Sequence, residues 1–111
     1  MVDEARFVVV FITTGSHESA EMIGRSLLEN KMAACVNVIP GVDSSFWWQG
    51  KIEKSGECLL VIKTKADKLD ELIKLVKQSH KDKVPEIIAM PIIGGNPDYL
   101  KWIDESIEKN L

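Results

Sequence analysis

The stretch that decides the fold is residues 32–64, which read MAACVNVIPGVDSSFWWQGKIEKSGECLLVIKT. It holds two strand-like apolar runs, at 34–39 and 58–64. Gln49-Gly50 predicts a tight turn between them, because glycine accepts the positive φ that hairpin turns require. Pro40-Gly41 predicts a bulge or bend on an edge strand, since proline has no N–H to donate to a strand ladder. The stretch therefore predicts a β-hairpin with arms much longer than the usual length of about 5–6 residues.

The expected tip of this hairpin carries three consecutive aromatic residues, Phe46, Trp47 and Trp48. Monomeric soluble proteins rarely expose an apolar group of this size to water. We therefore expect these residues to lie at an interface between copies of the chain, in a closed ring where each hairpin extends the sheet of the next subunit. The alternative is a hairpin that folds back and places the tryptophans in its own core.

The length and charge of the chain limit its class. A chain of 111 residues and 12.4 kDa predicts a single domain over 1–111, since domains commonly have about 100–150 residues. The net charge of −3 argues against a nucleic-acid surface, which is normally basic. No apolar run approaches the roughly 20 residues of a membrane-spanning helix. The first residues are polar, so we expect no signal peptide.

The two cysteines, Cys35 and Cys58, do not form a CxxC motif. With the turn centred on Gln49-Gly50, Cys35 is expected opposite Thr64 and Cys58 opposite Gly41. This register predicts no disulfide between them. Free thiols are typical of a reducing compartment, so the sequence predicts a cytoplasmic location.

The rest of the chain alternates strands and helices. The apolar, β-branched run at its start is typical of a central strand buried on both faces, and polar caps mark the helix starts. The order βαββαβ plus a terminal helix predicts an α+β, ferredoxin-like sandwich with both main helices on one face and the second and fourth strands at the edges. The expected elements outside the hairpin are a strand over 7–13, a helix from Ser16 to about Asn30, a helix capped by Asp67, a strand over 87–93 and a helix beginning at Asn96-Pro97.

Several segments of the sequence closely resemble the CutA family. They are LLENKMAACVNVIPG at 27–41, VPEIIAMPI at 84–92 and YLKWI at 99–103. The resemblance implies a compact homotrimer in which long hairpins join the sheets of neighbouring subunits, with an architecture similar to that of the PII signalling proteins. The family is named for divalent-cation tolerance, and copper binding is attributed to some of its members. The resemblance therefore implies a response to metal ions and no enzymatic activity.

The metal-binding residues of those members are only partly present here. Relatives to which copper binding is attributed carry a cysteine where this chain has Ile12, and a His-His pair where it has Ser79-His80. His80 is the best remaining metal ligand, with Glu86 close in sequence and Cys35 as a third candidate. The alternative for His80 is a histidine that caps a helix end, and the alternative for Cys35 is a small buried apolar residue.

The sequence thus predicts a CutA-like homotrimer that binds copper, another divalent metal or a small anion in clefts between subunits. The loop at 13–17, between a strand and a helix N-terminus, is the candidate anion site. The alternatives are a trimeric scaffold or signalling module without metal binding, and a hydrolase related to the acylphosphatases. The hydrolase needs an arginine in a phosphate-binding loop, whereas Arg6 precedes the first strand and Arg25 lies inside a helix.

Overall fold

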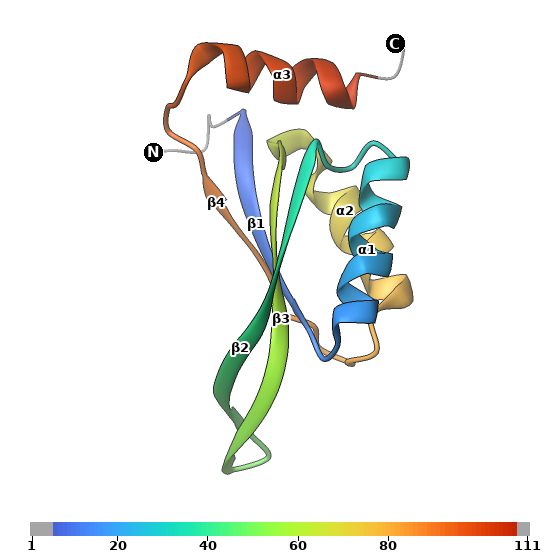
Figure 1. Ribbon diagram of the computed structural model, residues 1–111, viewed down its shortest axis with the longest axis vertical. Helices are drawn as coiled ribbons and strands as arrows, with labels where there is room; N and C mark the ends of the chain where they lie inside the picture. Colours follow the sequence, from blue (N-terminus) through green and yellow to red (C-terminus); the bar gives the residue numbers. More distant parts are fainter. Residues whose placement is uncertain (1–5, 109–111) are drawn as a thin grey trace.

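The structure, a computed structural model, describes residues 6–108 (Figure 1). Its four strands form one sheet in the order β2-β3-β1-β4, and every neighbouring pair is antiparallel. The α+β, ferredoxin-like prediction is confirmed, with the second and fourth strands at the edges. The polar start of the chain, from which we expected no signal peptide, lies outside the described residues. The elements are β1 (Phe7–Thr14), α1 (His17–Glu29), β2 (Cys35–Trp48), β3 (Lys51–Lys65), a 3₁₀ turn (Ala66–Lys68), α2 (Leu69–Ser79), β4 (Ile87–Pro91) and α3 (Pro97–Ile107).

The main core lies between one face of the sheet and the two helices α1 and α2, which lie on the same side in Figure 1. Burial alternates along β1, where Val8, Val10 and Ile12 are buried and the residues between them are only half-buried. The prediction that this strand is buried on both faces is therefore wrong. The reason is topological, because right-handed crossovers place both helices on the same face of the sheet.

The opposite side of the sheet, here called the open face, is also apolar. The pairing of β1 with its neighbours places alternate residues on this side. Ile39, Ile88 and Met90 are all exposed there. A face of this composition in water is typical of a surface that another protein covers. The apolar residues that these pairings place on the open face include Val9, Phe11, Ile39, Leu59, Val61, Ile88 and Met90.

The long hairpin forms as predicted, including its bulge. The ladder between β2 and β3 shifts by one residue between Ile39 and Val42, at Pro40-Gly41, and Gly41 has a φ of +75°. The register predicted from the turn alone did not include this shift. Cys35 consequently pairs with Lys63 instead of Thr64.

The bulge also changes the position of Cys58. It faces the bulged pair Pro40-Gly41, so it has no single Cα partner on β2, and it pairs with Thr14 of β1. Both cysteines are free.

The hairpin tip projects away from the rest of the chain (Figure 1). The turn uses positive φ at Gln49 and Gly50, as a tight hairpin requires. Phe46, Trp47 and Trp48 are all exposed, and Trp47 retains 72% of its accessible surface. The alternative in which the hairpin folds back over its own core is therefore wrong.

The helix boundaries depart from the prediction at two places. The first helix ends with Lys31 in the left-handed region, at φ 60°, instead of Asn30. Asp67 does not cap α2, because it lies in the 3₁₀ turn and α2 begins only at Leu69. The Asn96 cap of α3 is confirmed: its side-chain oxygen accepts a hydrogen bond from the backbone N–H of Asp98 at 3.0 Å.

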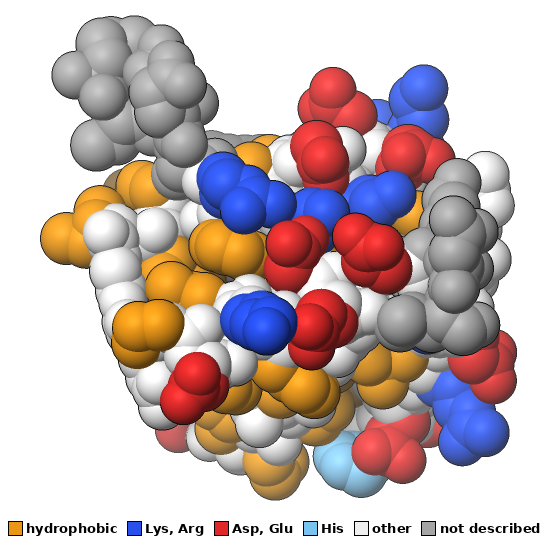
Figure 2. Space-filling model, turned by 90° about the horizontal axis from the view of Figure 1, so that it is seen from above, with side chains coloured by type: hydrophobic (Ala, Val, Ile, Leu, Met, Phe, Trp, Pro, Cys, Tyr) orange, Lys and Arg blue, Asp and Glu red, His pale blue; other side chains and the backbone are white. Residues whose placement is uncertain are grey.

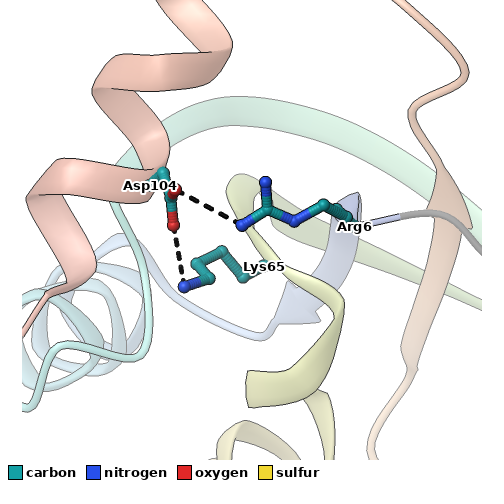
Figure 3. Close-up of polar contacts among 3 residues, drawn as sticks. All are labelled: Arg6, Lys65 and Asp104. Atoms are coloured by element: carbon teal, nitrogen blue, oxygen red, sulfur yellow. Dashed lines mark hydrogen bonds and ion pairs between the residues drawn. The ribbon is translucent and has the colours of Figure 1, made fainter.

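Helix α3 crosses the end of the sheet on the side of the open face, and its Ile103 and Ile107 are buried. Charged contacts hold it there. Asp104 Oδ1, which is shielded from water, lies 2.8 Å from Lys65 Nζ, and Asp104 Oδ2 accepts a hydrogen bond from Arg6 at 3.3 Å (Figure 3). Seen from above, this end of the molecule carries intermixed acidic and basic side chains (Figure 2).

These contacts change the titration of both partners. Hydrogen bonding to the Lys65 ammonium, with help from Arg6, holds the pKa of Asp104 below its ordinary value. The same contact raises the pKa of Lys65. The contribution of the pair to stability is present above the pKa of an unfolded aspartate, about 3.9, and is lost as the pH falls through the lowered folded value. At alkaline pH, the contribution of the pair to stability is present below the unfolded lysine pKa of about 10.4. It is lost as the pH rises through the raised folded pKa of Lys65.

We predict that Asp104→Asn lowers the free energy of unfolding by about 1 kcal/mol near pH 7, because the pair is partly screened by solvent. The difference from wild type should shrink at both ends of the pH range, as measured by urea unfolding at fixed protein concentration. Glu105→Gln is the matched control, since its exposed partner Lys101 lies 3.9 Å away. Equal losses in the two variants would contradict a specific role for Asp104.

Candidate functional site

His80 caps the C-terminus of α2 and connects it to the end of β1. One ring nitrogen, Nδ1, accepts a hydrogen bond from the backbone N–H of Asp82 at 3.0 Å. The other, Nε2, lies 2.8 Å from the carbonyl oxygen of Thr13, which can only accept. The proton must therefore be on Nε2, and both nitrogens are occupied. A metal ion could bind this imidazole only by displacing one of these hydrogen bonds.

Glu86 also contacts Thr13 of β1. The Thr13 hydroxyl donates to Glu86 Oε1 at 3.5 Å, a long contact, while the Thr13 carbonyl accepts from His80. The structure therefore brings two of the three predicted metal ligands together at Thr13. The sequence did not show this role of Thr13, because it depends on where the segment after α2 returns to the sheet.

Cys35 lies elsewhere. Its partner on β3, Lys63, is itself paired with Val9 of β1, and Thr13 is four residues further along that strand. At about 3.3 Å per residue, this places Cys35 more than about 13 Å from the His80 and Glu86 contacts. The structure does not unite the predicted three-ligand set.

The chemistry of these donors does not fit a metal ion within one chain. Among residues 6–108, no three histidine, cysteine, aspartate or glutamate side chains gather closely enough to hold an ion. The imidazole of His80 is already bonded on both sides, and the Glu86 carboxylate alone is a weak ligand set. Any metal site that uses this pair needs ligands from another molecule.

A cavity of about 230 Å³ lies beside His80, at the N-terminus of α1. The cavity adjoins the loop at 13–17, which the sequence suggested as a site for a small anion. Ser16 caps the helix by accepting from the backbone N–H of Ser19 at 3.1 Å, and the buried hydroxyl of Thr14 donates to the Ser16 carbonyl at 2.8 Å. The cavity is lined by Thr14, Gly15, Ser16, Ser19, Ile23, His80, Lys81 and Asp82.

We predict that His80→Ala costs about 1–2 kcal/mol of unfolding free energy. It removes the hydrogen bond from Nε2 to Thr13, which ties the segment after α2 to β1, and the hydrogen bond that Nδ1 accepts from Asp82 within that segment. His17→Ala is the matched control, because His17 is exposed at the start of α1. Urea unfolding of both variants at one protein concentration checks this. A loss no larger than that of His17→Ala would show that the His80 contacts contribute little.

The sheet order, the single helical layer and the overlong hairpin define the class: an α+β, ferredoxin-like protein whose second and third strands extend beyond the core. The family model of the CutA1 divalent ion tolerance protein matches residues 8–106. The chain belongs to this family.

The solved structures agree with this assignment. CutA1 from Oryza sativa is 42% identical and superposes with a TM-score of 0.91, covering 96% of this chain and 97% of the other. The CutA structure from Archaeoglobus fulgidus is 44% identical with a TM-score of 0.89, covering 92% and 99%.

The curated relatives carry related names. A divalent-cation tolerance protein CutA from Archaeoglobus fulgidus is 46% identical over 89% of this chain and 96% of its own length. Two plant CutA proteins, from Oryza sativa and Arabidopsis thaliana, are 43% and 40% identical. This chain spans only 58% and 54% of the length of those plant relatives. None of these names describes an enzyme.

The prediction of a cytoplasmic location, which was inferred from the free thiols, is wrong. The Oryza sativa and Arabidopsis thaliana relatives are named chloroplastic, and the Archaeoglobus fulgidus structure is described as periplasmic. Members of this family are thus named for more than one compartment. Within residues 6–108, no helix combines the length and apolar character needed to cross a bilayer.

Proposed function

We propose that this divalent-cation tolerance protein works as a non-enzymatic homotrimer, and that its subunits associate through the hairpin tip and the open face. The observation that carries the proposal is the exposed apolar surface at both places. Phe46, Trp47 and Trp48 project from the tip, while Ile88 and Met90 are exposed on an edge strand. Edge strands with unpaired backbone groups and apolar neighbours readily accept another chain.

A divalent cation is the ligand that the family name favours, and we place its binding at the boundary between copies. His80 and Glu86 meet at Thr13 and would supply at most two ligands from one chain. Copper and zinc sites use three or four ligands, so residues of a second copy must complete the set. Cys35 lies too far from this pair to join it within one chain.

Calorimetry tests the metal part of the proposal. We expect wild-type protein to bind Cu²⁺ and release protons, and Glu86→Gln to weaken binding about tenfold or more, because a neutral amide replaces the anionic ligand. Glu57→Gln is a control that leaves Thr13 and His80 untouched. Absence of heat in the wild type would remove metal binding from the proposal while leaving the assembly intact.

A small anion is a second candidate ligand, supported by the 230 Å³ cavity at the N-terminus of α1 with Lys81 on its wall. Helix N-termini favour negative charge. Inorganic phosphate is the probe. Heat on titration that disappears in Lys81→Ala would support this candidate, whereas no heat would exclude it for phosphate.

The arrangement of the two arginines argues against the hydrolase alternative. Arg6 binds Asp104 at 3.3 Å and Arg25 pairs with Glu29 at 3.0 Å on the exposed side of α1. Neither guanidinium lies on the wall of the cavity beside the loop after β1. Phosphoryl groups in active sites are normally held by positioned cations, so we expect no turnover of an acyl phosphate.

A further inference from the structure

A groove of about 440 Å³ lies between α1 and the edge strand β2, on the helical side of the sheet. From β2 it is lined by Val36 and Val38, which are only half-buried although their partners on β3 are fully buried. From α1 it is lined by the buried Ala20 and Gly24 and by Leu28, which retains 42% of its accessible surface. The groove is therefore apolar where helix and strand meet, and it faces away from the open face.

The strand beside the groove has a free backbone edge. β2 is the last strand of the sheet, and within residues 6–108 no strand pairs with its outer side. The bulge at Pro40-Gly41 ends the regular part of this edge, because the ladder shifts there and proline has no N–H to donate. The segment 35–39 is thus separate from the hairpin tip. An unpaired edge of this kind accepts an extended segment, whose alternate side chains then enter the groove beside Val36 and Val38.

The contact between α1 and β2 limits the size of those side chains. A Cβ added to Gly24 would lie 3.0 Å from Val36 Cγ1, so helix and strand touch at this point and the groove opens only outside the contact. Short β-branched side chains suit such a shallow space, and they also favour the strand conformation that the edge requires.

The charges on the helical wall favour a basic residue at one end of the groove. Arg25 and Glu29 pair with each other at 3.0 Å. Glu21 is exposed on the same wall and has no ion-pair partner among the described residues. Gly24 marks the contact with β2, and α1 and β2 run in opposite directions (Figure 1). Glu21, about one turn before Gly24, therefore lies toward the Val38 end of the groove.

We propose that this groove binds an extended segment of another protein, with short β-branched residues at alternate positions and a lysine or arginine at the Val38 end. The segment pairs antiparallel with β2, which is the commoner and slightly more stable arrangement, so its basic residue comes first in its chain. The proposal goes beyond cation tolerance. It depends on neither the metal nor the trimer, because the groove uses neither the open face nor the hairpin tip.

A synthetic peptide tests the proposal. The probe is acetyl-Thr-Lys-Thr-Val-Thr-Val-Thr-amide, whose lysine and two valines share one side of a strand. Nuclear magnetic resonance of the wild-type protein should show shifts of the amides at 35–39 and along α1, with slower hydrogen exchange at the edge, and a dissociation constant below about 1 mM. The amides of the hairpin tip should not shift. No shift at several millimolar peptide, or shifts confined to the open face, would overturn the proposal.

A charge exchange at Glu21 tests the position of the basic residue. Glu21→Lys should weaken binding of this peptide about fivefold, and should bind a peptide with glutamate in place of lysine about fivefold more tightly than wild type does. Glu18→Lys is the matched control, because Glu18 is exposed on the same helix, does not line the groove and changes the net charge equally. Circular dichroism confirms folding of both variants. Equal effects of the two substitutions would contradict a basic residue beside Glu21.

Sedimentation with the peptide distinguishes another protein from a second copy as the occupant of this groove. The oligomeric state should not change when the peptide binds, because the groove and the surfaces assigned to the trimer are separate. Dissociation of the assembly by the peptide would show that a second copy already pairs with the edge of β2, and would overturn the proposal. Failure of the trimer would appear without peptide, and failure of metal binding would appear in calorimetry, so both are distinguishable from failure of this proposal.

Discussion

Met90→Glu should convert the assembled protein into single chains of 12.4 kDa. Met90 lies on the edge strand β4, faces the open side of the sheet and retains 49% of its accessible surface. If a second copy covers this face, the new carboxylate must lose its hydration without a partner. That desolvation costs several kcal/mol per subunit, on the order of a hundredfold or more in the dissociation constant. Sedimentation at micromolar concentration measures the result directly.

Met22→Glu is the matched control for this experiment. Met22 lies on α1 and retains 58% of its accessible surface, so the same chemical change is made at a residue of similar exposure on the helical side. We expect it to leave the assembly intact. A wild-type protein that already sediments as a folded single chain at micromolar concentration would refute the trimer, as would equal dissociation of the two variants.

Leu60→Ala should have the largest effect on stability of any single change proposed for this chain, about 2–5 kcal/mol. Leu60 has no exposed surface and belongs to the core cluster between the sheet and the two helices. Its surroundings are tightly packed: a Cβ added to Gly24 of α1 would lie 3.0 Å from Val36 Cγ1 and 3.7 Å from Leu60 Cδ2. Neighbours this close leave little freedom to collapse into the space of a deleted side chain.

The measurement is the urea concentration at half-unfolding, at one fixed protein concentration because assembly contributes to the apparent stability. Leu28→Ala is the control, since Leu28 on α1 retains 42% of its accessible surface. It should lose less than about 1 kcal/mol. If both leucines cost the same, the core would lie elsewhere than the face under α1 and α2.

The parts of the fold that could be predicted from sequence are those set by local chemistry. Gln49-Gly50 formed the turn because both residues take positive φ, and Asn96 with Pro97 began a helix because one caps it and the other suits its first turn. The prediction that Asp67 caps α2 was wrong, and the cause is again local. The chain makes a 3₁₀ turn before α2, and local preference alone does not distinguish that turn from a first helical turn.

The candidate site was predicted only in part. His80 was correctly placed at a helix end, and both His80 and Glu86 contact Thr13. The sequence did not show that Thr13 contacts both of them, nor that Cys35 lies apart from them beside Lys63. A one-residue shift at Pro40-Gly41 decides the partner of Cys35, and such a shift changes every pairing beyond it.

The amino-acid sequence by itself determined the order of strands and helices, the long hairpin with its bulge, and the family, because all three follow from residue types at short spacing. Only the tertiary structure decided which side of the sheet the helices cover, which residues flank each candidate side chain, and how α3 is fastened by Asp104. These depend on contacts between residues far apart in the chain. Such contacts form only when several elements pack together, and no local pattern records which atoms then meet.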